Sequence, residues 1–304
     1  MHNVFVVVGP TSSGKTSLAL NLCKKYGGCI LSADSRQVYK GLDIGTGKQP
    51  INSTYNIERF EDKWLVDGVV IWGYDIIGQE GDWTGDSYAR FARSKILENL
   101  GTNIFLVGGT GFYIDLVTGK MQTSGIMPNS TLRKNLEATP LPKLLEQLSS
   151  LNPKALTNLD TNNPARIIRA IEIAKGQKIN TTPLPDVSNI NFVHVGLTAD
   201  REFLYERADK WVDYIWENGL LDEVKNNLAY AAFKPMQGLI YKTVIAYLNN
   251  ELAQEAAIQR IKWDMHAYIR RQQTWFKKNT EIKWFNIYDS SLLADVESYL
   301  NLLQ

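Results

Sequence analysis

The stretch from Val4 to Thr16 constrains the fold of this chain more than any other part of it. Val4–Val8 is an apolar run rich in β-branched residues, which predicts a buried strand. The run leads into Gly-x-x-x-x-Gly-Lys-Thr at Gly9–Thr16, and Ser17–Leu22 has the pattern of a helix. Strand, glycine-rich turn and helix start form a phosphate-binding loop, or P-loop. We therefore expect an α/β protein with a P-loop NTPase-like parallel sheet and flanking helices.

This loop has the chemistry that an anion requires. Gly9 and Gly14 allow a tight turn whose backbone N–H groups surround a phosphate, and the helix N-terminus adds partial positive charge. Lys15 can reach a terminal phosphate, and the hydroxyl of Thr16 can ligate Mg²⁺. The alternative is a glycine-rich turn without a ligand, and the strand-to-helix context argues against it. The motif does not say which phosphate compound binds.

The composition narrows the class of protein. Hydrophobic residues make up 44% of the 304 residues and charged residues 21%, as in ordinary globular proteins. No apolar run reaches the length of a membrane span, and the first strand lacks the basic flank of a signal peptide. Two cysteines and three histidines offer no zinc site, and we expect a cytoplasmic protein. With a net charge of +1, any nucleic-acid partner must be recognised by local patches.

The order of segments predicts one α/β core that is interrupted by an insertion. From about residue 121, prolines punctuate amphipathic helices, and a polar linker follows at 176–188. We place the core with its C-terminal helices at 1–121 and 188–304, and a helical insertion domain at 122–187. The stretch 52–86 is expected to be irregular apart from one strand. The expected strands after the first are Cys29–Ala33, Val69–Ile71, Asn103–Val107, Phe192–Thr198 and Trp284–Ile287.

Two features at predicted strand ends are candidates for chemistry. Asp34 follows a strand at the edge where parallel α/β sheets bind ligands, so it can hold Mg²⁺ through water or act as a general base. Its alternative role is that of a helix N-cap. Gly108–Gly111 ends another strand where an NTPase usually has an aspartate, and Thr110 there offers a hydroxyl and an N–H to an anion or sugar-phosphate. A simple strand-to-helix connection is the alternative for this turn.

Basic residues form the third candidate. Arg166 and Arg169 lie three apart on one face of a predicted helix, and Arg201 and Arg207 flank the start of a later one. Arginine forks suit phosphates, and aromatic residues stack on unpaired bases. A pair of arginines is more often a solvated helix face. Several such groups in a chain with a phosphate-binding loop favour a binding role.

Together these motifs resemble the family of the tRNA dimethylallyltransferases, also called tRNA isopentenyltransferases. The resemblance covers almost the whole chain, and its most specific part is Asp34–Thr46, with the sequence DSRQVYKGLDIGT. No zinc-finger extension follows the core, so the short bacterial type is the closer match. The other matching segments are Gly9–Thr16, Val107–Tyr113, Asn163–Arg166 with Arg169–Glu172, and Arg271–Phe276.

The resemblance implies transfer of a dimethylallyl group from dimethylallyl diphosphate to N6 of adenine 37, next to the anticodon, in tRNAs that read codons beginning with U. The P-loop, Lys15 and Mg²⁺ at Thr16 would hold the leaving diphosphate and neutralise its charge. Asp34 would accept the proton that the amine sheds, and Thr110 would orient the adenosine and the donor. The target base must leave the loop stack, and the insertion would close over the anticodon stem-loop. We expect a monomer.

The expected site residues fall into three groups. Catalysis is assigned to Asp34, Thr110 and Lys15, and the metal to Thr16. The donor diphosphate is assigned to Gly9, Thr11, Ser12, Ser13, Gly14, Lys15, Thr16 and Arg207. The tRNA is assigned to Asp34, Ser35, Arg36, Gln37, Thr110, Arg133, Ala165, Arg166, Ile167, Ile168, Arg169, Gln237, Tyr241 and Lys242.

The sequence also departs from the family pattern. Trp211 stands where the family has an arginine that meets the diphosphate, so Arg207 or Lys210 must take its place or the donor is held differently. Ile240 replaces a glycine before Tyr241, and the usual histidines near residue 70 are absent. Three other functions are open: an adenylate isopentenyltransferase of the cytokinin type, a small-molecule kinase with a P-loop, and a non-catalytic RNA-binding relative.

Overall fold

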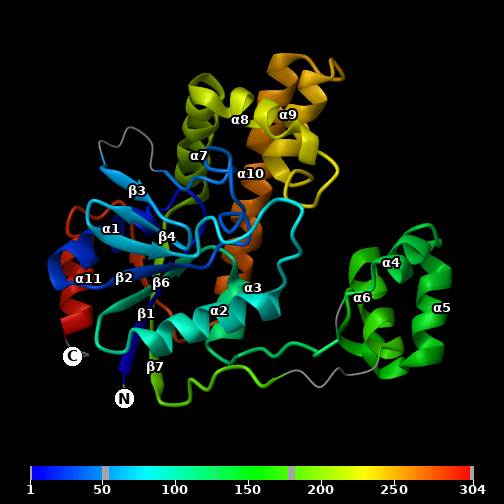
Figure 1. Cartoon of the computed structure of the whole chain (residues 1–304), viewed down its shortest axis with the longest axis horizontal. Helices are drawn as coiled ribbons and strands as arrows, with labels where there is room; N and C mark the ends of the chain where they lie inside the picture. Colours follow the sequence, from blue (N-terminus) through cyan, green and yellow to red (C-terminus); the bar gives the residue numbers. More distant parts are fainter. Residues whose placement is uncertain (1, 50–54, 127, 177–181, 302–304) are drawn as a thin grey trace. The chain divides into compact units, whose positions relative to one another are not determined.

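The computed structural model describes residues 2–49, 55–126, 128–176 and 182–301. It divides the chain into two compact units. The first, Met1–Met121 with Pro185–Gln304, combines a sheet with helices, and the second, Gln122–Leu184, is helical (Figure 1).

An eight-stranded sheet with the order β3-β4-β5-β2-β6-β1-β7-β8 runs through the described part of the first unit. Strand β1 lies inside the sheet between β6 and β7, and its residues Val4–Val8 are all buried. The P-loop that follows β1 is therefore anchored to a strand that is buried on both faces. The strands are β1 (His2–Val8), β2 (Cys29–Ser32), β3 (Ile57–Arg59), β4 (Lys63–Val66), β5 (Val69–Trp72), β6 (Ile104–Gly108), β7 (Ile190–Thr198) and β8 (Lys283–Asn286).

The sheet is mixed: most of it is parallel, as predicted, and an antiparallel edge that was not predicted adjoins it. Each neighbouring pair from β5 across to β8 is parallel, as predicted. Strand β4 instead pairs antiparallel with both β3 and β5. These edge strands lie within the stretch that was expected to be irregular. Consecutive antiparallel strands can be joined by short turns, whereas parallel strands need a crossover connection that usually contains a helix. The sequence around β3 and β4 therefore lacks the helical pattern that would separate parallel strands.

Helices cover both faces of the sheet (Figure 1). Residues Phe5 and Val7 face a core with α1 and α11, whereas the alternate residues Val4, Val6 and Val8 face α2 and α3. This alternation along β1 is the two-residue period of a strand with two buried faces. The helices involved are α1 (Lys15–Tyr26), α2 (Gly85–Glu98), α3 (Gly111–Val117) and α11 (Leu292–Asn301).

A helical layer follows β7 and packs around the loop after β2. Its core joins Val38, Tyr39 and Leu42 to apolar residues of α7, α8, α9 and α10. Between α7 and α8 the chain kinks at Asn218 and Gly219, whose backbone angles are non-helical, and Gly219 has φ of 101°. The layer comprises α7 (Arg201–Ile215), α8 (Leu221–Asn226), a 3₁₀ turn (Leu228–Tyr230), α9 (Leu239–Leu248) and α10 (Gln254–Phe276).

The second unit has a small core of its own. Leucines 136, 144 and 148 pack against Ile167, Ile168 and Ile171. Asn129 and Asn163 cap two of its helices by accepting hydrogen bonds from Leu132 N and Arg166 N. Its helical elements are α4 (Ser130–Glu137), α5 (Leu141–Leu151), a 3₁₀ turn (Pro153–Asn158) and α6 (Pro164–Lys175).

Candidate active site

One cavity of about 730 Å³ in the first unit gathers most of the predicted site residues of that unit. The P-loop contributes Thr11, Ser12, Gly14, Lys15 and Thr16, and its neighbours along the wall come from segments far apart in the sequence. The predicted residues that also line it are Asp34, Ser35, Arg36, Gln37, Arg207, Gln237 and Tyr241. Of the other residues predicted in this unit, Gly9, Ser13, Thr110 and Lys242 lie outside the lining.

The P-loop backbone explains its glycines. A Cβ at Gly9 would lie 2.5 Å from the carbonyl oxygen of Leu197, so only glycine fits where the loop leaves β1. Gly14 has φ of 82° at the N-cap of α1, a left-handed conformation that glycine adopts without strain. The hydroxyl of Ser13 is buried, and its backbone N–H donates a hydrogen bond to Pro10 O at 3.3 Å, which closes the turn.

Two cations meet at this loop. Lys15 Nζ donates a hydrogen bond to Pro10 O at 2.7 Å, and burial lowers the pKa of Lys15 to about 8, while the carboxylate of Asp34 acts in the opposite direction. Arg207 Nε donates to Ser12 O at 2.8 Å from α7. The two side chains place positive charge at the loop, as the binding of a diphosphate requires.

Asp34 has the capping role that its position suggested, and its carboxylate also lines the cavity. Its Oδ1 accepts hydrogen bonds from the backbone N–H groups of Arg36 at 2.8 Å and Gln37 at 3.4 Å, which is a capping role. The carboxylate also lines the cavity, close enough to Lys15 to influence its pKa. Its predicted role as a base stays a prediction.

Thr110, which follows β6, contacts the segment Asp34–Gln37, here called the Asp34 turn. Its Oγ1 accepts a hydrogen bond from Ser35 N at 3.2 Å, and it lies next to the side chain of Tyr268, which lines the cavity. Thr110 therefore supports the Asp34 turn directly. Its predicted contact with adenosine and donor stays a prediction.

Gln272 of α10 is a site residue to which the sequence assigned no role. Its Oε1 accepts a hydrogen bond from Thr11 N at 2.8 Å, and its Nε2 donates to Gly109 O at 3.1 Å. A Cβ at Gly109 would lie 2.1 Å from this Nε2, which explains the glycine in the turn after β6. Gln272 thereby ties the P-loop to that turn. The motif Arg271–Phe276 marked the segment but not its contacts.

Gln237, just before α9, and Tyr241, within it, both line the cavity but differ in exposure. Gln237 is exposed, whereas Tyr241 is buried and donates its hydroxyl proton to Glu223 Oε1 at 2.9 Å. Burial, followed by the charge of Glu223, raises the pKa of Tyr241 well above its ordinary value. Arg36 donates to Lys234 O at 3.1 Å, so its guanidinium braces the segment before α9.

Trp211 lines the cavity one helical turn after Arg207. Its ring is partly exposed, and a Cβ at Gly47 would lie 3.6 Å from Trp211 Cζ2. The departure from the family pattern thus lies inside the candidate site. Arg207 keeps a cation on the same helix, whereas Lys210 forms an exposed ion pair with Glu206 and does not line the cavity.

Two of the predicted tRNA contacts of the helical unit, Arg133 and Arg169, bond to the buried carboxylate of Glu172. Glu172 Oε1 and Oε2 each accept a hydrogen bond from Arg133 at 2.8 Å, Arg169 donates to Oε2 at 3.1 Å, and Asn129 N donates at 2.8 Å. Burial opposes ionisation, but these bonds hold the pKa of Glu172 below its ordinary value. Arg133 therefore joins α4 to α6, whereas Arg169 bonds within α6 and donates to Ile126 O at 2.7 Å.

The other predicted contacts on α6 differ in exposure. Ala165 and Arg166 are exposed at the start of the helix. Ile167 and Ile168 are buried in the core of the unit at 0% and 6% exposure. Their side chains cannot contact RNA from these positions, because the helix turns this face inward.

The donor atoms of the cavity fit a magnesium ion. Mg²⁺ prefers hard oxygen ligands and usually takes one or two from the protein, with the remainder from phosphates and water. Thr16 and Asp34 supply a hydroxyl and a carboxylate in the lining. The described residues contain no group of three or more His, Cys, Asp or Glu that could hold a metal without a phosphate ligand.

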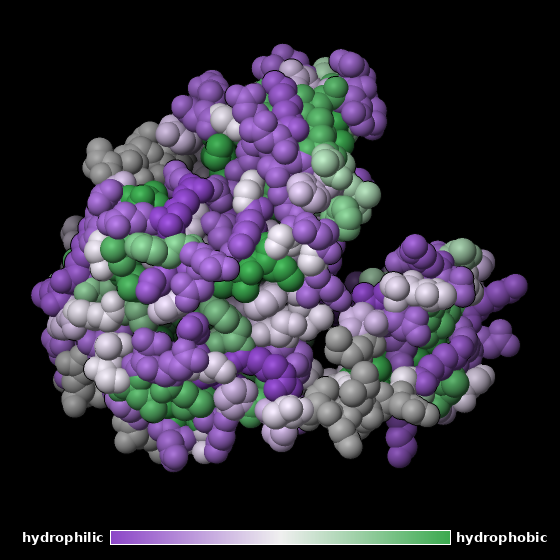
Figure 2. All heavy atoms as spheres, in the orientation of Figure 1, coloured by the Kyte–Doolittle hydropathy of each residue, from purple (hydrophilic) through white to green (hydrophobic). Residues whose placement is uncertain are grey.

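Polar and charged side chains cover most of the face that Figure 2 shows, with smaller apolar patches between them. Among the helices of the described ranges, none has both the length and the apolar character to cross a membrane.

A sequence model of the family described as IPP transferase matches residues 37–279. The chain belongs to this family. It is 34% identical to the tRNA dimethylallyltransferase of Acetivibrio thermocellus, with 99% of the chain and 98% of that relative covered. It is 35% identical to the enzyme of the same name from Pelotomaculum thermopropionicum, with 97% and 93% covered. The family predicted from the motifs is confirmed.

Solved structures agree with this assignment. The full-length tRNA isopentenylpyrophosphate transferase of Bacillus halodurans is 31% identical, with a TM-score of 0.71 over 99% of this chain and 96% of that one. A eukaryotic dimethylallyltransferase acting on tRNA has a TM-score of 0.75 at 22% identity, over 98% of this chain and 78% of that one. The second likeness is one of fold. Together they confirm the predicted α/β fold with flanking helices.

Proposed function

We propose that this IPP transferase moves a dimethylallyl group from dimethylallyl diphosphate to N6 of adenine 37, next to the anticodon, in tRNAs that read codons beginning with U. The observation that carries the proposal is that residues of the P-loop and of the Asp34 turn line the same cavity. A phosphate holder and a proton acceptor within one cavity are the two groups that this transfer needs. We further infer that it acts in the cytoplasm as a monomer.

The donor is held by its diphosphate. The backbone N–H groups of the P-loop, the ammonium of Lys15 and the guanidinium of Arg207 bind the oxygens and stabilise the charge that develops when the allylic C–O bond breaks. Thr16 would hold Mg²⁺ together with the diphosphate oxygens, and the bound ion would add further charge neutralisation to the leaving group. Leaving-group stabilisation carries much of the barrier, because the prenyl carbon becomes positive as this bond weakens.

The acceptor amine needs a proton acceptor, since N6 of adenine is a weak nucleophile that sheds a proton as it attacks. Asp34 Oδ2 accepts this proton while Oδ1 stays bound to Arg36 N and Gln37 N. The backbone bonds keep the carboxylate in one orientation during the reaction. Gln237 lines the same cavity and its amide oxygen can accept a hydrogen bond from the extruded base, whereas the amide of Gln37 is bonded to Thr46 O, Gly47 O and Ser32 Oγ and shapes the cavity wall.

The experiment that tests this function supplies labelled dimethylallyl diphosphate and Mg²⁺ with either unmodified tRNA or AMP. We expect label on tRNA alone, and mapping of the modified nucleotide should place it at adenine 37. A tRNA in which guanine replaces that adenine serves as the matched control. Label on AMP would favour an adenylate isopentenyltransferase, ATP hydrolysis in a parallel assay would favour a kinase, and RNA binding without transfer would favour a non-catalytic relative.

A further inference from the structure

The segment Asp43–Lys48, here called the wall loop, forms part of the cavity through Gly45, Thr46 and Gly47. Behind it lies Glu223 of α8, which does not line the cavity. Glu223 Oε2 accepts hydrogen bonds from the backbone N–H groups of Asp43 at 2.6 Å and Ile44 at 2.7 Å, and Oε1 accepts from Gly45 N at 2.9 Å. Three successive amides thus converge on one carboxylate, as in an anion-binding nest.

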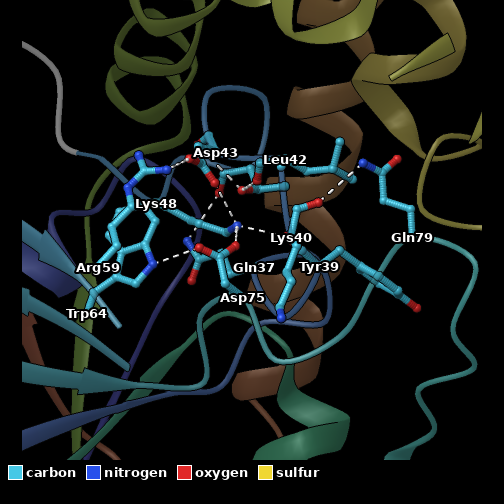
Figure 3. A network of polar contacts seen from close by, with 12 residues as sticks. Gln37, Tyr39, Lys40, Leu42, Asp43, Lys48, Arg59, Trp64, Asp75 and Gln79 are labelled. Atoms are coloured by element: carbon cyan, nitrogen blue, oxygen red, sulfur yellow. Dashed lines mark hydrogen bonds and ion pairs between the residues drawn. The ribbon is translucent and has the colours of Figure 1, made fainter. Parts of the chain in front are cut away.

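The other end of the wall loop is fixed by a buried ammonium (Figure 3). Lys48 is fully buried, and its Nζ donates to Tyr39 O and Asp43 Oδ1 at 2.8 Å and to Asp75 Oδ1 at 2.5 Å. The edge strands complete the network, because Arg59 pairs with Asp43 Oδ2 and Trp64 Nε1 donates to Asp75 Oδ2, both at 2.7 Å. Every buried charge in this cluster has a partner, which is the condition for keeping it in the fold.

Glu223 also connects the wall loop to the helix that carries Tyr241. The hydroxyl of Tyr241 donates to the same Oε1 that accepts from Gly45 N. The two residues lie in close contact, since a Cβ at Gly45 would be 2.7 Å from Tyr241 Oη. On the other side, Gln37 Nε2 donates to Thr46 O at 3.1 Å and Gly47 O at 3.3 Å. The wall loop is therefore held between the Asp34 turn, α8 and α9.

We propose that Glu223 is a positioning residue for the transfer reaction, one that sets the place of the wall loop through its negative charge. The inference rests on the proposed function. The wall loop meets Trp211 at Gly47, and Trp211 shares α7 with Arg207, which binds the P-loop. A shift of the loop would therefore change the part of the cavity next to the P-loop, where the donor is bound. No neutral side chain of the same size can accept from all three amides.

The test replaces Glu223 by glutamine, which keeps the volume and removes the charge. In either orientation of the new amide, its NH₂ group faces at least one backbone N–H, and that N–H then has no acceptor. We expect the affinity for dimethylallyl diphosphate, measured by calorimetry with Mg²⁺, to fall at least tenfold, and kcat/KM for the donor to fall with it. The KM for tRNA should change less than threefold.

Two further variants make the test decisive. Asp222→Asn removes a carboxylate from the neighbouring, exposed position of α8 and should leave donor affinity and kcat/KM unchanged. Gly45→Ala displaces the wall loop from the Tyr241 side while Glu223 keeps its charge, and we expect the same donor-specific loss. This variant carries the test if Glu223→Gln does not fold.

The outcomes separate the inference from the proposed function. If Glu223→Gln melts at a lower temperature but keeps the wild-type donor affinity and kcat, Glu223 is merely structural and the inference is overturned. A folded Gly45→Ala variant with unchanged donor affinity would have the same consequence. A wild-type protein that neither binds the donor nor modifies tRNA would instead overturn the proposed function.

Discussion

At the scale of single residues, Asp34 has two oxygens with different tasks. Oδ1 accepts two backbone N–H groups, so replacement by asparagine preserves this bond through its amide oxygen but cannot take a proton. We expect Asp34→Asn to slow single-turnover transfer by about 10²–10⁴-fold. Its affinity for tRNA, measured by filter binding, should stay within threefold of wild type. A rate within a few-fold of wild type would show that Asp34 is not the base.

Asp34→Ala provides the matched comparison. It loses the base and the capping bonds together, so we expect the same loss of rate with an additional loss of stability of about 1 kcal/mol. The difference between the two variants in urea unfolding therefore measures the capping role of Oδ1. Equal stability of the alanine and asparagine variants would mean that the capping bonds contribute little.

Trp211 is the residue at which this chain departs most clearly from its family. The ring is partly exposed in the cavity, one turn after Arg207, so the position can accept a charged side chain without burying it. We expect Trp211→Arg to keep or improve the affinity for dimethylallyl diphosphate, because a guanidinium would add a second cation on α7. Calorimetry checks the affinity. A variant that fails to fold would instead show that the ring has become part of the core.

At the scale of elements, the sequence predicts those with a strong pattern and misses the short ones. The β1 strand, the P-loop turn and α1 follow from an apolar run, glycines and helical spacing. Strands β3 and β4 have three and four residues, and the three of β3 are at most partly buried. The sequence does not indicate their role, which depends on contacts with distant residues. Arg59 pairs with Asp43 and Trp64 donates to Asp75, and both carboxylates bind Lys48.

The helical unit offers a test that separates RNA contact from structural support. Arg166 is exposed and lies 3.9 Å from exposed Asp160, so Arg166→Ala should barely change stability. If Arg166 contacts a phosphate, this variant should bind tRNA several-fold more weakly, with a shallower dependence on salt concentration.

Arg133→Ala should instead destabilise the unit by about 1–3 kcal/mol, because Glu172 loses two hydrogen bonds in a buried position. Thermal unfolding and filter binding with an anticodon stem-loop measure both. Equal tRNA affinity of Arg166→Ala and wild type would remove Arg166 from the interface.

At the scale of the whole molecule, the site is assembled from segments that the sequence keeps far apart. The P-loop, Asp34 and Arg207 could be predicted because their residue types carry a known chemistry at a strand end or helix start. Glu223 and Gln272 could not be given roles in the same way. Their partners are backbone atoms of distant loops, and a sequence pattern does not encode which loop a helix will meet.

The stability of the first unit should depend on pH through His194. This side chain of β7 is buried at 2% exposure, and burial, together with Lys120, lowers its pKa to about 4, although Glu281 acts in the opposite direction. The unfolded chain has the ordinary histidine pKa of 6.5, so between pH 6.5 and 4 it binds more protons than the folded protein. Acidification through this window therefore favours unfolding, by about 3 kcal/mol in total from this residue. His194→Phe keeps an aromatic ring in the core without a titrating nitrogen. We expect urea unfolding at pH 6.5, 5.5 and 4.5 to show that the free energy of unfolding falls less steeply with acidification in this variant than in the wild type. Equal slopes in the two proteins would mean that protonation of His194 does not destabilise the folded state.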